Sequence, residues 1–103
     1  MTAEFHTSRP TDDVAASVEV TGEIDLANAD EFSGALGAAL GDGSRLTVDL
    51  SATTYLDSAA IKVLFEWTHR AALTLIVPAD GIVAPVISLA GLDTVATVRQ
   101  PTA

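Results

Sequence analysis

The sequence predicts an α/β or α+β domain with five strands and three helices in the order β-β-α-β-α-β-α-β. One observation leads to this prediction, and two others restrict it further. Segments that are apolar at every second position alternate with segments that follow the 3.6-residue period of a helix. The 103 residues suffice for one domain and are too few for two, so we expect residues 1–103 to fold as one unit. The chain has no cysteine, which excludes disulfide frameworks and zinc–thiolate sites.

The first part of the chain is expected to form two strands. Residues 5–8 read as a short first strand. Residues 9–13 read as a turn, because Pro10 restricts the backbone and aspartate side chains bond to nearby backbone groups. Residues 14–20 read as the second strand, and we expect this strand to end at Gly22.

A first helix is expected after this strand. Asn28 is its predicted N-cap, and Glu31 three residues later makes the sequence close to a capping box. Asp42 and Gly43 are expected to close the helix. The apolar residues that predict a buried stripe recur every four positions: Phe32, Leu36 and Leu40.

A third strand over residues 46–50 is expected to lead through a short loop into a second helix, which extends to about Ala71. Either Asp57 or Ser58 caps that helix. Trp67 lies off the predicted stripe, so it either packs in the core or at the sheet margin, or anchors an interface. The predicted buried stripe comprises Ile61, Leu64, Phe65 and Thr68.

The last part of the chain is expected to add two strands and a short helix. Residues 73–77 are almost entirely apolar, which is typical of a strand covered on both faces. The helix is expected to begin near Ala84, so that Pro85 occupies the favoured first position, and to end at Gly91. Residues 94–98 form the final strand.

The charge balance restricts the possible partners. The chain has 14 acidic and 5 basic residues and a formal net charge of −9, which argues against binding to nucleic acid or to an anionic membrane surface. The first five residues contain no basic segment and no apolar core of a signal peptide. The longest apolar run is far shorter than the roughly 20 residues of a membrane-spanning helix. We therefore expect a cytoplasmic location.

Few residues suggest catalysis. Glu23, Asp25 and Asp57 admit an acid–base role, but their positions favour loop and turn ordering. His69 lies eleven residues after Ser58 on the same predicted helix, about 16 Å away, which excludes a direct hydrogen bond. The sequence contains neither a metal-ligand pattern nor a phosphate-binding loop, so we expect no metal and no cofactor. A small hydrolase is the least favoured interpretation.

Ser58 has two interpretations at the start of the second helix. It serves as an N-cap, or it is a phosphorylation site, since free backbone N–H groups and the helix dipole tolerate added negative charge there. A phosphate adds about −1.5 to −2 charges.

Three motifs carry a family resemblance. The first is residues 20–25, Val-Thr-Gly-Glu-Ile-Asp. The second combines residues 48–51, Val-Asp-Leu-Ser, with residues 55–58, Tyr-Leu-Asp-Ser. The third is residues 89–92, Leu-Ala-Gly-Leu. In this order and spacing, over about residues 15–100, the chain resembles the STAS domains, specifically the bacterial anti-sigma-factor antagonists.

The resemblance implies a binding protein that is not an enzyme. In this family an antagonist docks on an anti-sigma factor that is also a serine kinase, and docking frees the sigma factor. The kinase phosphorylates the serine that corresponds here to Ser58, which ends the binding, and a serine phosphatase restores it. The resemblance also implies an α/β fold, in which a small mixed β-sheet of about four to five strands is flanked by about three to four helices.

The resemblance places the partner-binding surface around the first two motifs. The chain departs from the family pattern at Ala59, Ala60 and Ile61, where the family usually has Ser or Thr, then Gly, then Leu. An alternative role is therefore a constitutive STAS subunit of a lipid-transport ABC assembly or another signalling complex, without phosphorylation. The expected contact residues are Gly22, Glu23, Ile24, Asp25, Asn28, Thr54, Tyr55, Leu56, Asp57, Ser58, Ala59, Ala60, Ile61 and Lys62.

Overall fold

The computed structural model describes residues 2–101 and contains five strands and three α-helices in that part of the chain. The predicted order of elements is confirmed, with a short 3₁₀ turn, η1, added before the last strand. The elements are β1 (Ala3–Ser8), β2 (Ala16–Ile24), α1 (Ala29–Leu40), β3 (Arg45–Leu56), α2 (Ser58–Thr68), β4 (Ala72–Ile76), α3 (Val83–Leu89), η1 (Leu92–Thr94) and β5 (Thr97–Arg99).

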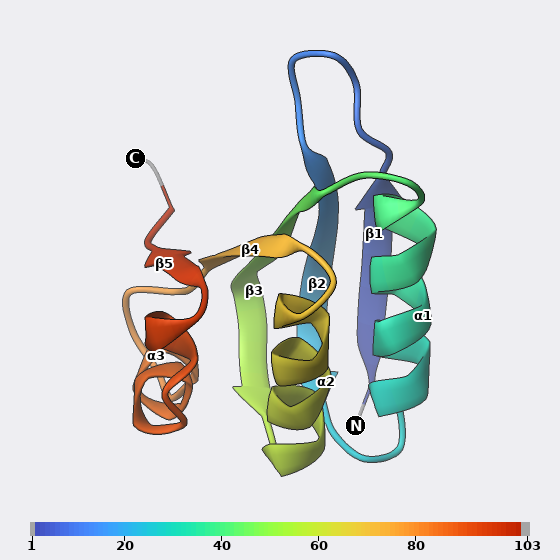
Figure 1. Cartoon of the computed structure of the whole chain (residues 1–103). Coiled ribbons are helices and arrows are strands. Elements are labelled where there is room, and N and C mark those ends of the chain that lie inside the picture. The colour runs from blue at the N-terminus through green and yellow to red at the C-terminus, as the bar shows by residue number, and fades with distance from the viewer. Residues whose placement is uncertain (1, 102–103) are drawn as a thin grey trace.

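The five strands form one mixed sheet in the order β1-β2-β3-β4-β5. β1 is antiparallel to β2, and the remaining neighbours are parallel. Each parallel pair is joined through a helix, and right-handed crossovers between successive neighbours place all three helices on one face of the sheet (Figure 1). The predicted α/β fold is confirmed.

The core lies between the sheet and this helical layer. Val18, Val48 and Leu75 lie side by side in register on three neighbouring strands and are fully buried under the helices. Glu19 and Asp49 lie opposite each other in register on the face without helices. Because that face is polar, apolar and polar residues alternate along β2 and β3 instead of forming uniformly apolar runs.

Trp67 fills the contact between α1 and α2. It is 6% exposed, and its Nε1 donates to the Ser33 hydroxyl at 3.0 Å. A β-carbon placed on Gly37 would lie 3.3 Å from Trp67 Cη2, so the glycine provides the space for the indole ring. The Arg70 guanidinium lies 5.0 Å from the centre of the ring on its outer side. The core placement of Trp67 is confirmed.

The predicted buried stripe of α2 is partly wrong, because the buried face of the helix includes Trp67. The face of α2 that points into the core includes Val63, Leu64 and Trp67. Ile61, Phe65 and Thr68 are only partly buried.

Several predicted boundaries are also wrong. β2 does not end at Gly22 but continues to Ile24, because Gly22 takes a φ of 96° beside a register shift in the ladder. β3 has no loop after residue 50 and continues to Leu56, since the Thr53 hydroxyl, buried under the helices, donates to the Val20 carbonyl.

The helices also end or begin at other residues than expected. α1 ends at Leu40 and α2 ends at Thr68, each about one turn or less before the predicted end. α3 begins at Val83, which puts Pro85 third in the helix, where its missing N–H still has no intrahelical acceptor to lose. Gly91 ends the α3 segment with a φ of 86°, as expected. The last strand begins only at Thr97 because η1 occupies the preceding residues.

Candidate functional site

The candidate site lies at the carboxyl edge of the sheet, where β2 and β3 end side by side. Ile24 and Leu56 are paired in register as the last residues of these strands. The loop that leads to α1 therefore lies next to the first turn of α2. Ser58 is the first residue of α2 and is exposed. Carboxyl edges of parallel strands are the usual location of binding sites in α/β sheets.

Asp57 connects the two segments. Its Oδ1 accepts hydrogen bonds from the backbone N–H groups of Ala59, at 2.9 Å, and Ala60, at 3.2 Å. Its Oδ2 accepts from the backbone N–H of Leu26 at 3.2 Å, 31 residues away in sequence. One carboxylate thus caps α2 and holds the neighbouring loop, and Asp57 rather than Ser58 is the N-cap.

The loop before α1 is ordered by its own side chains. Asn28 Oδ1 accepts from the backbone N–H of Asp25 at 2.9 Å, and Asn28 Nδ2 donates to the Glu23 carbonyl at 2.9 Å. Asp25 Oδ1 accepts from the backbone N–H of Ala27 at 2.9 Å. Asn28 is the N-cap residue of α1, as predicted, but the capping box does not form, because the Asn28 side chain turns back into the loop and makes no cap hydrogen bond to α1.

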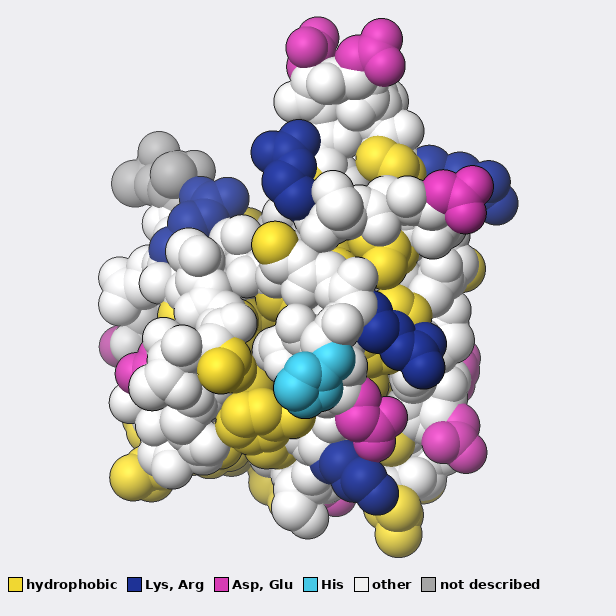
Figure 2. Space-filling model, viewed as in Figure 1, with side chains coloured by type: hydrophobic (Ala, Val, Ile, Leu, Met, Phe, Trp, Pro, Cys, Tyr) yellow, Lys and Arg dark blue, Asp and Glu magenta, His cyan; other side chains and the backbone are white. Residues whose placement is uncertain are grey.

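Apolar side chains surround Ser58 on the surface. Leu26 is 79% exposed and Leu89 is 89% exposed, fractions that are high for leucine in a folded domain. An open groove of about 360 Å³ runs between α2 and α3, and Figure 2 shows apolar side chains gathered there. The residues that line this groove are Leu56, Asp57, Ser58, Ile61, Val86, Leu89 and Ala90.

We call the surface formed by Leu26, Ser58, Ile61 and Leu89 the Ser58 face. The sequence reasoning placed Ser58 and Ile61 on it but missed both leucines. Leu26 had a signal, since it is a large apolar residue in the short loop between Asp25 and Asn28. Leu89 had none, because an apolar residue in the last turn of a short helix is equally compatible with the core.

The predicted contact residues divide by exposure. Ile24, Leu56 and Ala60 are at most 2% exposed, so their side chains belong to the core and are unavailable to a partner. Thr54, Ser58 and Lys62 are exposed. The others are partly exposed: Gly22, Glu23, Asp25, Asn28, Tyr55, Asp57, Ala59 and Ile61.

The carboxylates of this edge serve backbone groups rather than one another. Asp57 and Asp25 accept from backbone N–H groups, which favours the loop-ordering interpretation over an acid–base pair. Within residues 2–101, no three His, Cys, Asp or Glu side chains are grouped closely enough to hold a metal ion. His69 lies at the far end of α2 from Ser58. Over the same residues, no helix is long and apolar enough to cross a membrane.

One family model covers most of the chain. The sequence model of the family described as "Mlab, STAS domain" matches residues 7–99. No curated protein sequence matches the chain. A crystal structure of an anti-sigma factor antagonist from Mycobacterium paratuberculosis is similar with a TM-score of 0.82 and 27% identity, covering 98% of this chain and 87% of that one.

Two further structures are similar in fold. A candidate anti-sigma factor antagonist from Thermotoga maritima has a TM-score of 0.74 and 22% identity, over 94% of this chain and 86% of that one. The anti-sigma factor antagonist SpoIIAA in its unphosphorylated form has a TM-score of 0.65 and 11% identity, over 97% and 90%.

Proposed function

Since the chain belongs to the STAS domain family, we propose that it is an anti-sigma-factor antagonist, a cytoplasmic binding protein and not an enzyme. It binds an anti-sigma factor that is also a serine kinase, frees the sigma factor, and is switched off when Ser58 is phosphorylated. A serine phosphatase reverses the switch. The observation that carries the proposal is the exposed Ser58 hydroxyl at the centre of an apolar surface. The similarity to the Mycobacterium antagonist supports it.

The Ser58 face has the composition of a docking surface. Leu26 and Leu89 are large apolar side chains that gain by leaving water, which is typical of interface anchors. Asp25 and Glu23 are partly exposed carboxylates at the rim, and the chain carries a net charge of −9. Such a surface favours association with a partner that presents apolar pockets within a basic surround.

Phosphorylation of Ser58 is compatible with the fold and incompatible with docking. The Ser58 side chain is exposed, so its modification displaces no buried group of the folded domain. A phosphate at the first position of α2 lies at the positive end of the helix dipole. It adds about −1.5 to −2 charges to a groove lined by Leu56, Ile61 and Leu89. A partner that covers the groove must then desolvate a dianion.

Quantitative capture from lysate of the source cell tests the docking. The baits are wild type, Ser58→Ala and Ser58→Glu. We expect wild type and Ser58→Ala to retain an anti-sigma factor, and Ser58→Glu to retain at least about tenfold less, which corresponds to about 1.4 kcal/mol. Leu89→Ser should reduce capture similarly, whereas Val14→Ser, at another exposed apolar position, should not. Equal capture by Ser58→Glu and wild type would refute the switch.

The modification itself is tested by intact mass. Incubation with the captured kinase and ATP should add one phosphate to wild type and none to Ser58→Ala. If Ser58→Ala still gains a phosphate, the assignment of the site is wrong.

A second candidate function is a constitutive STAS subunit of a lipid-transport ABC assembly or another signalling complex. The residues after Ser58 favour it. Ala59 and Ala60 donate their N–H groups to Asp57, and Ala60 is fully buried, so the first turn of α2 is held in helical form. A kinase must therefore recognise Ser58 within a rigid helical turn. Unmodified Ser58 in growing and stressed cells, with co-purification of a transporter ATPase, would favour this candidate.

A further inference from the structure

The outer edge of β1 has no partner strand among residues 2–101. β1 is the first strand in the sheet order and pairs only with β2. Its six residues, Ala3–Ser8, are exposed or partly exposed. An uncovered edge presents a row of backbone N–H and C=O groups that can pair with another extended strand. The side chains along β1 decide which strand the edge can accept.

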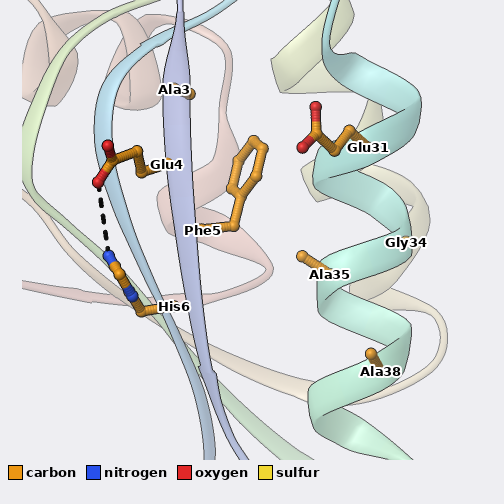
Figure 3. A pocket seen from close by; sticks show the side chains of 8 residues that line it. All are labelled: Ala3, Glu4, Phe5, His6, Glu31, Gly34, Ala35 and Ala38. Atoms are coloured by element: carbon orange, nitrogen blue, oxygen red, sulfur yellow. Dashed lines mark ion pairs between the residues drawn. The ribbon is translucent and has the colours of Figure 1, made fainter.

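These side chains divide between the two faces of the sheet. Glu4 and His6 lie on the face away from α1, and the Glu4 carboxylate is 3.7 Å from His6 Nε2 (Figure 3). Phe5 points toward α1, where its ring stacks on Phe32 with centroids 5.8 Å apart. The edge thus carries an acidic and a basic side chain two positions apart, with an apolar one between them.

The helix beside this edge offers small residues. An open hollow of about 630 Å³ lies between β1 and α1, and its helical side is formed by Glu31 in the first turn of α1 and by the small residues Gly34, Ala35 and Ala38 beyond it (Figure 3). A β-carbon on Gly34 would have no neighbour within 4 Å, so nothing in the chain's own fold requires a glycine there. Glycine in a helix costs about 0.8–1 kcal/mol relative to alanine. A close contact between α1 and another molecule would explain why a glycine occupies position 34.

We propose that β1 pairs antiparallel with β1 of a second copy of this chain, about a twofold axis that passes beside Phe5. In this register Phe5 lies opposite Phe5 of the second copy, and Glu4 lies opposite His6 twice, once on each side of the axis. The edge thus places an imidazole N–H donor opposite a carboxylate acceptor on both sides of the axis, and this complementarity to itself identifies a second copy as the occupant. The 3.7 Å contact between Glu4 and His6 within one chain shows that these two side chains can pair.

The helical layer fits the same arrangement. α1 contacts both β1 and β2, so it lies above the border of the sheet. With neighbouring strands about 4.8 Å apart, the α1 helices of two joined copies lie on one face about 8–10 Å from each other. That distance requires small residues between the helices, and Gly34, Ala35 and Ala38 are small. Ser58 follows β3, two strands from the axis, so both copies keep it uncovered.

Sedimentation equilibrium from micromolar to millimolar concentration tests the pairing. A six-residue edge is small for an interface, so we expect a weak dimer whose mean mass rises from 10.6 kDa toward twice that value. His6→Glu places two carboxylates opposite each other at two positions, and Glu4→Lys removes the carboxylate acceptor that faces each imidazole, so each variant should weaken the dimer about tenfold. His69→Glu makes the same charge change as His6→Glu at an exposed position far from β1 and should leave the dimer intact.

A mixture of the two variants makes the test independent of their folding stability. In a mixed pair, the cation introduced by Glu4→Lys faces the carboxylate introduced by His6→Glu, and the unchanged His6 of one copy faces the unchanged Glu4 of the other. An equimolar mixture should therefore associate about tenfold more tightly than either variant alone. Gly34→Gln, whose side chain meets nothing in its own fold at the β-carbon, should abolish dimerisation by separating the helices. A wild type that stays at 10.6 kDa at millimolar concentration, or a mixture no tighter than its components, overturns the proposal.

Discussion

Asp57→Ala should separate the two segments that form the candidate site. The carboxylate accepts three backbone N–H groups, two in the first turn of α2 and one at Leu26 in the loop before α1. Alanine supplies no acceptor. We therefore expect the first turn of α2 to fray and the loop to lose its connection to it.

The magnitude follows from the two kinds of bond. Loss of an N-cap costs about 0.5–2 kcal/mol in the free energy of unfolding. The bond to Leu26 is exposed, so its loss adds about 0.5–1 kcal/mol, at the lower end of the usual range. The sum for Asp57→Ala is about 1–3 kcal/mol. Asp57→Asn keeps one carbonyl oxygen for the cap and loses the second acceptor, and it should cost only about 0.5–1 kcal/mol.

Chemical denaturation followed by tryptophan fluorescence measures the total effect, because Trp67 is the single tryptophan and is buried. Amide hydrogen exchange then separates the two contributions. The Leu26 amide should exchange faster in both variants, whereas the Ala59 and Ala60 amides should exchange faster only in Asp57→Ala. If the Leu26 amide is unchanged in both variants, or if Asp57→Asn is as unstable as Asp57→Ala, the reasoning about a shared carboxylate is refuted.

Four other substitutions test the packing and the loop, each by denaturation of the purified protein. Gly34→Ala should raise the free energy of unfolding by about 0.5–1 kcal/mol because it meets nothing and favours helix, and an unchanged midpoint would contradict this. Gly37→Val should lower it by about 1–3 kcal/mol and shift the emission of Trp67, because its side chain enters the space of the indole ring; unaltered fluorescence would refute that contact. Asn28→Ala should lower it by about 1–2 kcal/mol through loss of two loop hydrogen bonds, and a neutral result would mean that the loop holds without them. Gly22→Ala should lower the free energy of unfolding by more than about 1 kcal/mol, because φ is 96° and the added carbon would collide with the Thr2 carbonyl oxygen. An unchanged free energy of unfolding would contradict this backbone conformation at Gly22.

The predictions from sequence failed where a side chain or a helix face had two alternative sets of partners. Asn28 has the sequence of a cap, but its side chain bonds to the Glu23 carbonyl and the Asp25 N–H instead of the free N–H groups of α1. The stripe of α2 was misplaced because its rotation depends on a gap in α1, at Gly37, which the sequence of α2 cannot reveal. The first error concerns a choice between local backbone partners within one loop, and the second concerns a contact between two helices.

The site was predicted in part for the same reason. Asp57 and Ser58 could be placed at a helix start because capping is a local property of a few residues. The bond from Asp57 to Leu26, and the proximity of Leu89 on α3, join segments more than 30 residues apart. Ile24, Leu56 and Ala60 were expected at the surface because they lie within or directly after the motifs, yet burial is decided by what packs above them.

The amino-acid sequence by itself determined the order of strands and helices and the position of Ser58 at the start of a helix. These depend on hydrophobic period, turn residues and caps, which act over a few residues. Only the tertiary structure decided which apolar residues stay exposed around Ser58, that Asp57 holds two segments at once, and that one edge of the sheet is uncovered. Those features depend on which distant segments meet, and the free energy of such contacts is realised only when the chain is folded.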